Sequence, residues 1–105
     1  VLQPDLYYNG GFIRCLKVAQ MAEKAGIGFS PHSPKTDPLA AAMLHLMAVV
    51  PNSGGYQEWH IGYPDHKSWY APHYEIKNGK IDVPNDPGLG IIFDESIWAK
   101  AEKMK

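Results

Sequence analysis

The feature that most constrains the fold is the alternation of short apolar segments with helical segments in the first 60 residues. A short apolar piece ends at Asp5, a helix is predicted over residues 12–25, and an apolar segment of strand length follows at 27–30. A second helix is predicted to end at Val50, and a third short strand around residues 56–59. Strand, helix, strand, helix, strand with short connections is typical of parallel βαβ units. The chain is therefore predicted to have an α/β fold.

The two predicted helices differ in how much of their surface must be covered. In the first, a polar and an apolar face separate at spacings of three and four: Arg14, Lys17, Gln20 and Lys24 on one side, and Leu16, Ala19 and Ala22 on the other. Gly26 follows as its C-terminal cap. The second helix begins at Pro38 with Asp37 as its N-cap, and it is apolar nearly all round apart from His45. We expect neighbouring structure to cover most of it.

Three parallel strands leave two long unpaired edges, and a parallel sheet normally has both faces covered. We therefore expect further strands upstream of this chain. The sequence starts at Val1 with neither an initiator Met nor a signal-peptide layout, so the natural chain is expected to begin earlier. The isolated chain is expected to be unstable or to aggregate, because its apolar strand edges would be exposed.

After residue 60 the pattern changes to a tail of short elements. An aromatic and Pro-rich loop over residues 61–72 leads to a hairpin, which is predicted from Asn78-Gly79 between two short alternating runs. A strand is predicted over 91–93, followed by a terminal helix capped by Asp94. The residues of that helix predicted to face inward are Ile97, Trp98 and Ala101.

The composition excludes several classes of function. A net charge of -1 and a pI near 6.5 provide no basic surface for nucleic acid. The longest apolar stretch, residues 39–50, is well short of the ~20 residues that cross a bilayer, so no membrane contact is expected. The single Cys15 excludes an internal disulfide and a cysteine zinc site. We read it as a buried thiol and expect a reducing, cytoplasmic location.

Three residues that carry acid or base chemistry lie at the ends of the three predicted strands: Asp5, His32 and Glu58. His32 follows Asp5 by 27 residues and Glu58 follows His32 by 26, each about one βα repeat. All three should therefore emerge at one end of neighbouring strands ~4.8 Å apart. There, Asp5 would orient the imidazole of His32, which would move a proton. Glu58 would donate a hydrogen bond to an enolate oxygen if its carboxyl carries a proton.

Non-catalytic interpretations of the same residues remain open on spacing alone. Asp5 would cap the following turn, His32 would be a loop histidine, and Glu58 would pair with a lysine. Three further residues near the strand ends are candidates for substrate contact, against surface or packing roles: Tyr7, Lys35 and Asp37. Tyr8 and Asn9 lie at the same mouth.

Two other motifs are weaker. His60, His66 and His73 recur at intervals of six and seven residues, which is no recognised zinc spacing. Gly88 and Gly90 form half of a dinucleotide fingerprint, but Phe93 stands where the third glycine belongs, so we interpret this stretch as a turn.

Several short motifs in a fixed order resemble the mandelate racemase and muconate lactonizing enzyme group of the enolase superfamily, from residue 1 to about residue 95. They are Gln3-Pro4-Asp5 with Gly10-Gly11, Pro31-His32-Ser33, Ala40-Ala41-Ala42 with His45-Leu46, Gln57-Glu58, and Val83-Pro84 with Pro87-Gly88-Leu89-Gly90. The resemblance implies that residues 1–60 are strands six to eight of a TIM-type (β/α)₇β barrel with their helices. It also implies that residues 61–105 are a hairpin and helix tail returning toward an N-terminal capping domain.

The resemblance also implies an activity. Asp5 and His32 match the acid/base dyad of the mandelate racemase subgroup, and Glu58 matches the glutamate that hydrogen-bonds the substrate carboxylate. The full-length enzyme would remove the proton α to a carboxylate, as a racemase, epimerase or dehydratase of a hydroxy or sugar acid, with Mg²⁺ stabilising the enolate. A base on only one face, His32, suits dehydration of a β-hydroxy acid.

The family's metal-binding carboxylates and its strand-two lysine have no counterpart in this sequence, so no metal ligand is assigned to it. The expected partners are a small carboxylate substrate and the remainder of the barrel with its capping domain; a homo-oligomer of the full-length enzyme is left open. This chain alone is expected to be inactive. The alternatives are a non-catalytic scaffold or interaction fragment that has lost the metal site, and a metal-independent isomerase.

Overall fold

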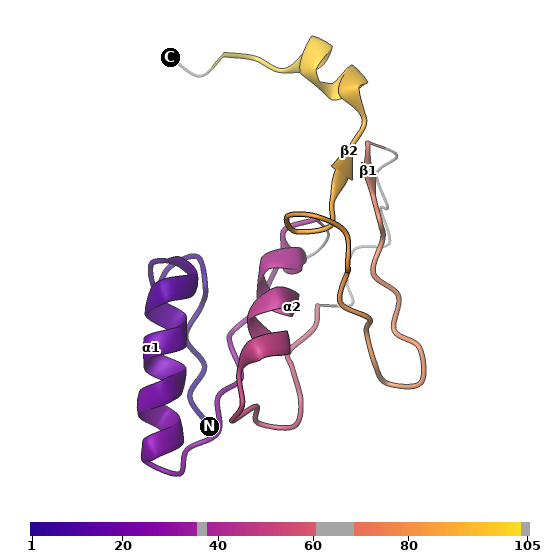
Figure 1. The fold of residues 1–105 in the computed structure, drawn as a ribbon. Helices are drawn as coiled ribbons and strands as arrows, with labels where there is room; N and C mark the ends of the chain where they lie inside the picture. The colour runs from indigo at the N-terminus through magenta and orange to yellow at the C-terminus, as the bar shows by residue number, and fades with distance from the viewer. Residues whose placement is uncertain (36–37, 61–68, 104–105) are drawn as a thin grey trace.

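The structure is a computed structural model and describes residues 1–35, 38–60 and 69–103. Two α-helices come first, and a small two-stranded sheet and a 3₁₀ helix form the C-terminal part (Figure 1). In chain order the elements are α1 (Gly11–Lys24), α2 (Ala40–Val49), β1 (Tyr70–Ala71), β2 (Ile92–Phe93) and the 3₁₀ helix η1 (Glu95–Lys100).

Three chain segments run parallel beside these helices, paired through single bridges. Leu2 bridges Phe29, and Phe29 bridges Ser53, both in parallel. The Leu2 amide donates to the Gly28 carbonyl at 2.8 Å, and the Gly54 amide donates to the Phe29 carbonyl at 2.9 Å. The predicted order of three parallel neighbouring segments is therefore confirmed, with the Phe29 segment in the middle.

The predicted position of the third strand is wrong, because its bridge lies at Ser53 and not within residues 56–59. Beyond Gly54 the chain continues beside the middle segment, but side chains make the contacts. The Ser30 hydroxyl donates to the Tyr56 carbonyl at 2.7 Å, and the Gln57 amide donates to the Pro31 carbonyl at 2.6 Å. The side chains thus replace the backbone ladder where the strand was expected.

Helix α1 packs through small side chains, as its sequence pattern predicts. Cys15, Ala19 and Ala22 are buried on one face, while the charged face is exposed. Gly26 ends the helix with a φ of 66°, a left-handed conformation that favours glycine, and Ile27 then donates to the Ala22 carbonyl at 2.8 Å. This turn after α1 leads the chain directly into the middle parallel segment, the one that contains Phe29.

The main core lies where α1, α2 and the parallel segments meet. Phe29 and Leu46 are fully buried in it, and Cys15 and Ala19 contribute from α1. The prediction that α2 is mostly covered is confirmed over residues 40–46, although Val49 near its end is 63% exposed. Only the first two thirds of this apolar helix are thus enclosed by described residues.

The tail forms a second, smaller core against the other side of α2. Met43 and Leu44 pack there with Tyr74, and the His45 imidazole lies 3.2 Å from the Leu89 carbonyl. The predicted hairpin is confirmed: Lys77 and Lys80 pair across Asn78 and Gly79. Both turn residues have positive φ angles, 52° and 73°, as a type I′ turn requires.

The predicted orientation of the terminal helix is only partly confirmed. Asp94 caps it by accepting from the Ser96 amide at 2.8 Å, as expected. However, Trp98 is 65% exposed, Ala101 lies exposed beyond the end of η1, and Ile97 is half-buried. The cause is geometric, because η1 projects from the body of the described chain and has no layer on which to lay an apolar face (Figure 1).

The outer parallel segments lack further strand partners among the residues that the structure describes. Within the described ranges Leu2 pairs with the Phe29 segment alone; it is 40% exposed, and Val1 beside it is 73% exposed. An exposed apolar edge of this kind is a template for pairing with another chain. In the described ranges, none of the helices has the length and apolar character of a bilayer span.

We expect the isolated 105-residue chain to self-associate through this edge, and Leu2→Lys to reduce the association, because an edge lysine opposes strand addition. Sedimentation velocity measures the effect. Ile13→Lys is the matched control, because Ile13 is 72% exposed but lies on α1 and not on the edge. A monomeric wild-type chain that unfolds cooperatively, or equal effects of the two lysines, would contradict this expectation.

Candidate active site

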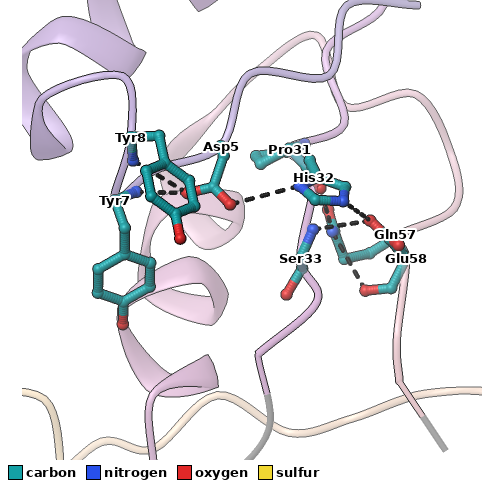
Figure 2. A network of polar contacts seen from close by, with 8 residues as sticks. All are labelled: Asp5, Tyr7, Tyr8, Pro31, His32, Ser33, Gln57 and Glu58. Atoms are coloured by element: carbon teal, nitrogen blue, oxygen red, sulfur yellow. Dashed lines mark hydrogen bonds and ion pairs between the residues drawn. The ribbon is translucent and has the colours of Figure 1, made fainter.

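Asp5 is held by the backbone of the turn that follows it. Its Oδ1 atom accepts hydrogen bonds from the Tyr7 amide at 2.7 Å and the Tyr8 amide at 3.1 Å. The carboxylate is nearly buried, with 9% of its side-chain surface exposed. Two donors on one oxygen fix the plane of the carboxylate and direct its other oxygen, Oδ2, toward the neighbouring segment (Figure 2).

The second carboxylate oxygen of Asp5 contacts the imidazole of His32. Its Nδ1 atom lies 3.3 Å from Asp5 Oδ2, and 48% of its side-chain surface is exposed. Where the carboxylate is ionised it can only accept, so a neutral imidazole in this contact carries its proton on Nδ1 and has Nε2 as its acceptor. The arrangement gives an oriented imidazole in a side chain that is only half-buried.

Glu58 lies on the opposite side of the imidazole from Asp5 (Figure 2). Its Oε2 atom accepts from the Ser33 amide at 2.7 Å and lies 3.8 Å from His32 Nε2. The second distance is too long for a hydrogen bond but within the range of an ion pair, which forms when the imidazole is protonated (Figure 2). His32 is thus flanked by two carboxylates, one on each ring nitrogen.

The predicted convergence of Asp5, His32 and Glu58 is confirmed by these distances. The turn-capping interpretation of Asp5 is also correct, and the two interpretations are compatible because different oxygens are used. Because the Leu2 and Phe29 segments pair in parallel, both segments end at the same edge, and the side chains of Asp5 and His32 meet there. Their catalytic roles stay predictions.

The candidate substrate contacts lie in a different arrangement. The Tyr7 hydroxyl donates to the Leu39 carbonyl at the start of α2, so it is already engaged. The Lys35 ammonium lies 5.9 Å from the Tyr7 ring centroid and 5.3 Å from that of Tyr8, within the range of cation–π attraction. Asp37 lies outside the described residues. Lys35 therefore links the loop after His32 to the loop after Asp5.

The three residues Tyr7, Tyr8 and Asn9, which follow Asp5 closely, have distinct environments. Burial, reinforced by the negative charge of Asp5, raises the pKa of Tyr7 above its ordinary value of 10.0. The side-chain amide of Asn9 lies 3.4 Å from the buried Cys15 sulfur. Asn9 therefore packs against α1, and Tyr8, which is 82% exposed, is the one of the two open to solvent.

Sequence reasoning assigned no role to Gln57 and Ser33, which both take part in the polar network (Figure 2). Gln57 Nε2 donates to the Pro31 carbonyl, and the Ser33 amide donates to Glu58. The signal in the sequence was the position of each residue beside a candidate acid or base at a strand end.

The weaker motifs gain no chemical role. His60 is exposed and His73 stacks edge-on against Tyr70 at 4.6 Å, while His66 lies outside the described residues. Gly88 and Gly90 have positive φ angles, and the Gly90 amide donates to the Pro87 carbonyl at 3.2 Å, which confirms a turn.

The part of the chain that the structure describes does not fit a Mg²⁺ site. None of its His, Cys, Asp and Glu side chains gather in groups of three or more that could hold a metal ion. Mg²⁺ prefers an octahedral set of oxygen ligands. The two carboxylates beside His32, those of Asp5 and Glu58, instead each have one oxygen that accepts a hydrogen bond from the backbone.

Comparisons with known proteins agree with one another. The sequence model of the family described as enolase C-terminal domain-like matches residues 1–97. The chain is 34% identical over 110 residues to a D-galactonate dehydratase from Xanthomonas axonopodis pv. citri (strain 306), covering 98% of this chain and 28% of that protein. The chain therefore spans less than a third of the length of this relative.

Solved structures that are similar to this chain also belong to the enolase superfamily. A member of the enolase superfamily from Polaromonas sp. JS666 superposes with a TM-score of 0.75 at 33% identity, over 97% of this chain and 27% of that one. An enolase of the mandelate racemase subgroup from Agrobacterium tumefaciens superposes with a TM-score of 0.79 at 27% identity, over 95% and 27%. The described fold is thus similar to part of each of these larger chains.

We expect the raised pKa of Tyr7 to appear as a loss of stability at high pH. The unfolded chain releases the Tyr7 proton near its ordinary pKa of 10.0, before the folded chain does, so stability is full below pH 10 and falls as pH rises through the folded pKa. Chemical denaturation of wild type and Tyr7→Phe between pH 8 and pH 11 measures this. Tyr7→Phe should show the shallower decline, and Tyr56→Phe, at a residue 90% exposed, should match wild type. Identical slopes for wild type and Tyr7→Phe would contradict the assignment.

Proposed function

Because this chain belongs to the enolase C-terminal domain-like family, we propose that it is the C-terminal part of a (β/α)₇β barrel enzyme that removes the proton α to a carboxylate. In this proposal the Leu2, Phe29 and Ser53 segments are barrel strands six, seven and eight. Residues 61–105 are the tail that returns to a capping domain. The upstream strands of the same enzyme would pair with the open edges described above.

His32 is the proposed general base. The observation that carries the proposal is the contact of 3.3 Å between its Nδ1 atom and an Asp5 carboxylate that two backbone amides hold in place. Asp5 fixes the tautomer, so the lone pair of Nε2 is on the side of the ring next to Glu58, where it would accept the substrate proton. The negative charge of Asp5 then stabilises the imidazolium that forms.

Glu58 is proposed to bind the reacting carboxylate. Its Oε2 atom is held by the Ser33 amide, while its Oε1 atom makes no hydrogen bond within the described ranges. A proton on Oε1 would be donated to the oxygen that gains charge as the enolate forms. The distance of 3.8 Å from His32 keeps this carboxyl next to the base, where the α-carbon and its carboxylate would both be in reach.

The proposed reaction is dehydration of a β-hydroxy sugar acid, and D-galactonate is the first substrate to test because relatives carry the name D-galactonate dehydratase. His32 takes the α-proton, and the C–H electrons enter the enolate. These electrons then expel the β-hydroxyl group, which takes the proton from the His32 imidazolium and leaves as water, and the resulting enol tautomerises to the keto acid. Racemisation instead requires a second base on the opposite face of the substrate.

The Mg²⁺ that the family resemblance implies would stabilise the negative charge of the enolate. The described residues do not form a site for it, so we assign its ligands to the upstream part of the enzyme.

We expect His32→Asn in the full-length enzyme to reduce exchange of the substrate α-proton with solvent deuterium by about a thousandfold or more, because the base is lost. Proton NMR of D-galactonate in D₂O measures the exchange. His45→Asn is the matched control, since His45 lies on α2 with its imidazole on the Leu89 carbonyl and not on the dyad, and it should leave exchange unchanged.

Retained exchange in a folded His32→Asn enzyme would reject the assignment of the base. Absence of exchange in the wild-type enzyme, with D-galactonate and with other hydroxy acids, would instead favour the alternative of a non-catalytic scaffold. Exchange that persists after complete removal of divalent metal would favour a metal-independent isomerase.

A further inference from the structure

The backbone on both sides of His32 is restrained by its own sequence. Pro31 has a fixed φ and is fully buried, and Ser33 precedes Pro34, which holds Ser33 to extended conformations. The remaining freedom lies in the rotation of the two peptide planes that flank His32. These planes carry the Pro31 carbonyl on one side and the Ser33 amide on the other.

Two consecutive residues of the neighbouring segment hold these two planes. Gln57 Nε2 donates to the Pro31 carbonyl at 2.6 Å, and Glu58 Oε2 accepts from the Ser33 amide at 2.7 Å (Figure 2). With both planes fixed, the direction of the His32 Cα–Cβ bond is fixed as well. The imidazole then needs only its two side-chain torsions to meet Asp5.

The side chain of Gln57 is held at a cost. Its Oε1 atom is buried and has no hydrogen-bond partner among the described residues. A buried polar atom left unpaired lowers stability, because it has given up its hydrogen bonds to water without gaining others. An apolar side chain of the same size would avoid that cost but would leave the Pro31 carbonyl without its donor. The advantage of an amide at this position is therefore the hydrogen bond from its nitrogen to the Pro31 carbonyl.

We propose that Gln57 is a positioning residue: through the Pro31 carbonyl it sets the orientation of His32 toward Asp5 and toward the substrate. This inference rests on the proposed function of His32 as the base. Within the described part of the chain, the Gln57 amide donates to the Pro31 and Glu58 carbonyls and makes no hydrogen bond to the dyad. It acts on catalysis only through the backbone.

The test is Gln57→Met in the full-length enzyme, which keeps the length of the side chain and removes the donor. A base displaced by about 1 Å slows proton transfer by up to a hundredfold, so kcat for α-proton exchange should fall about tenfold to a hundredfold. KM should stay within about twofold, since Gln57 does not touch substrate. The ¹⁵N shifts of the His32 ring should change from a single Nδ1–H tautomer to a mixture.

Asn52 provides the matched control for a purely structural effect. It is also a half-buried amide that spans segments, donating to the Ala19 and Ile27 carbonyls at 3.0 Å each, and its Oδ1 atom is likewise buried without a partner. It precedes the Ser53 bridge, whereas Gln57 follows it. Asn52→Leu should lower stability and leave the His32 tautomer and the kcat of the remaining folded enzyme unchanged.

If Gln57→Met does not fold, Gln57→Asn replaces it, because the shorter amide stays polar but cannot reach the Pro31 carbonyl. Wild-type kcat and an unchanged tautomer in either folded variant would overturn the inference. Equal losses of kcat in Asn52→Leu would overturn it too. If the wild-type enzyme exchanges no proton, the proposed function fails, while the tautomer measurement still decides whether Gln57 positions His32.

Discussion

The site depends on one interaction across two parallel segments, the contact between Asp5 Oδ2 and His32 Nδ1. Two residues far apart in sequence meet because Leu2 and Phe29 pair in a register that carries both segments to the same edge. A shift of one residue would turn one of the two side chains to the other face of the sheet. The buried Phe29 side chain, packed between α1 and α2, holds that register.

The side chains of the site also support the loops that carry them. Asp5 binds the backbone of the turn after it, Glu58 binds the Ser33 amide, and Gln57 binds the Pro31 carbonyl. Backbone groups at the ends of parallel strands have lost their ladder partners and need others. Here the polar side chains of the site are those partners. The same hydrogen bonds therefore position the side chains of the site and satisfy the backbone groups at the strand ends.

The helices, the Asn78-Gly79 turn and the meeting of Asp5 with His32 could be predicted because each follows from a local pattern or from a repeat of fixed length. The third strand was placed too late, because the pattern of residues 56–59 does not show that side chains there replace the ladder. Trp98 was predicted to be inward from its helical spacing, but a helix buries a face only where a layer exists to cover it. Gln57 was seen in a motif, but its role was missed because its partner is a backbone carbonyl, which the sequence does not identify.

The most direct test of the account is a double-mutant cycle between Asp5→Asn and His32→Asn, with the rate of α-proton exchange in the full-length enzyme as the readout. If Asp5 acts by orienting His32, its substitution has nothing left to disturb once the imidazole is gone. The account therefore predicts that the double variant is no slower than His32→Asn alone. Multiplied losses, with Asp5→Asn slowing the His32→Asn enzyme as strongly as it slows wild type, would contradict it.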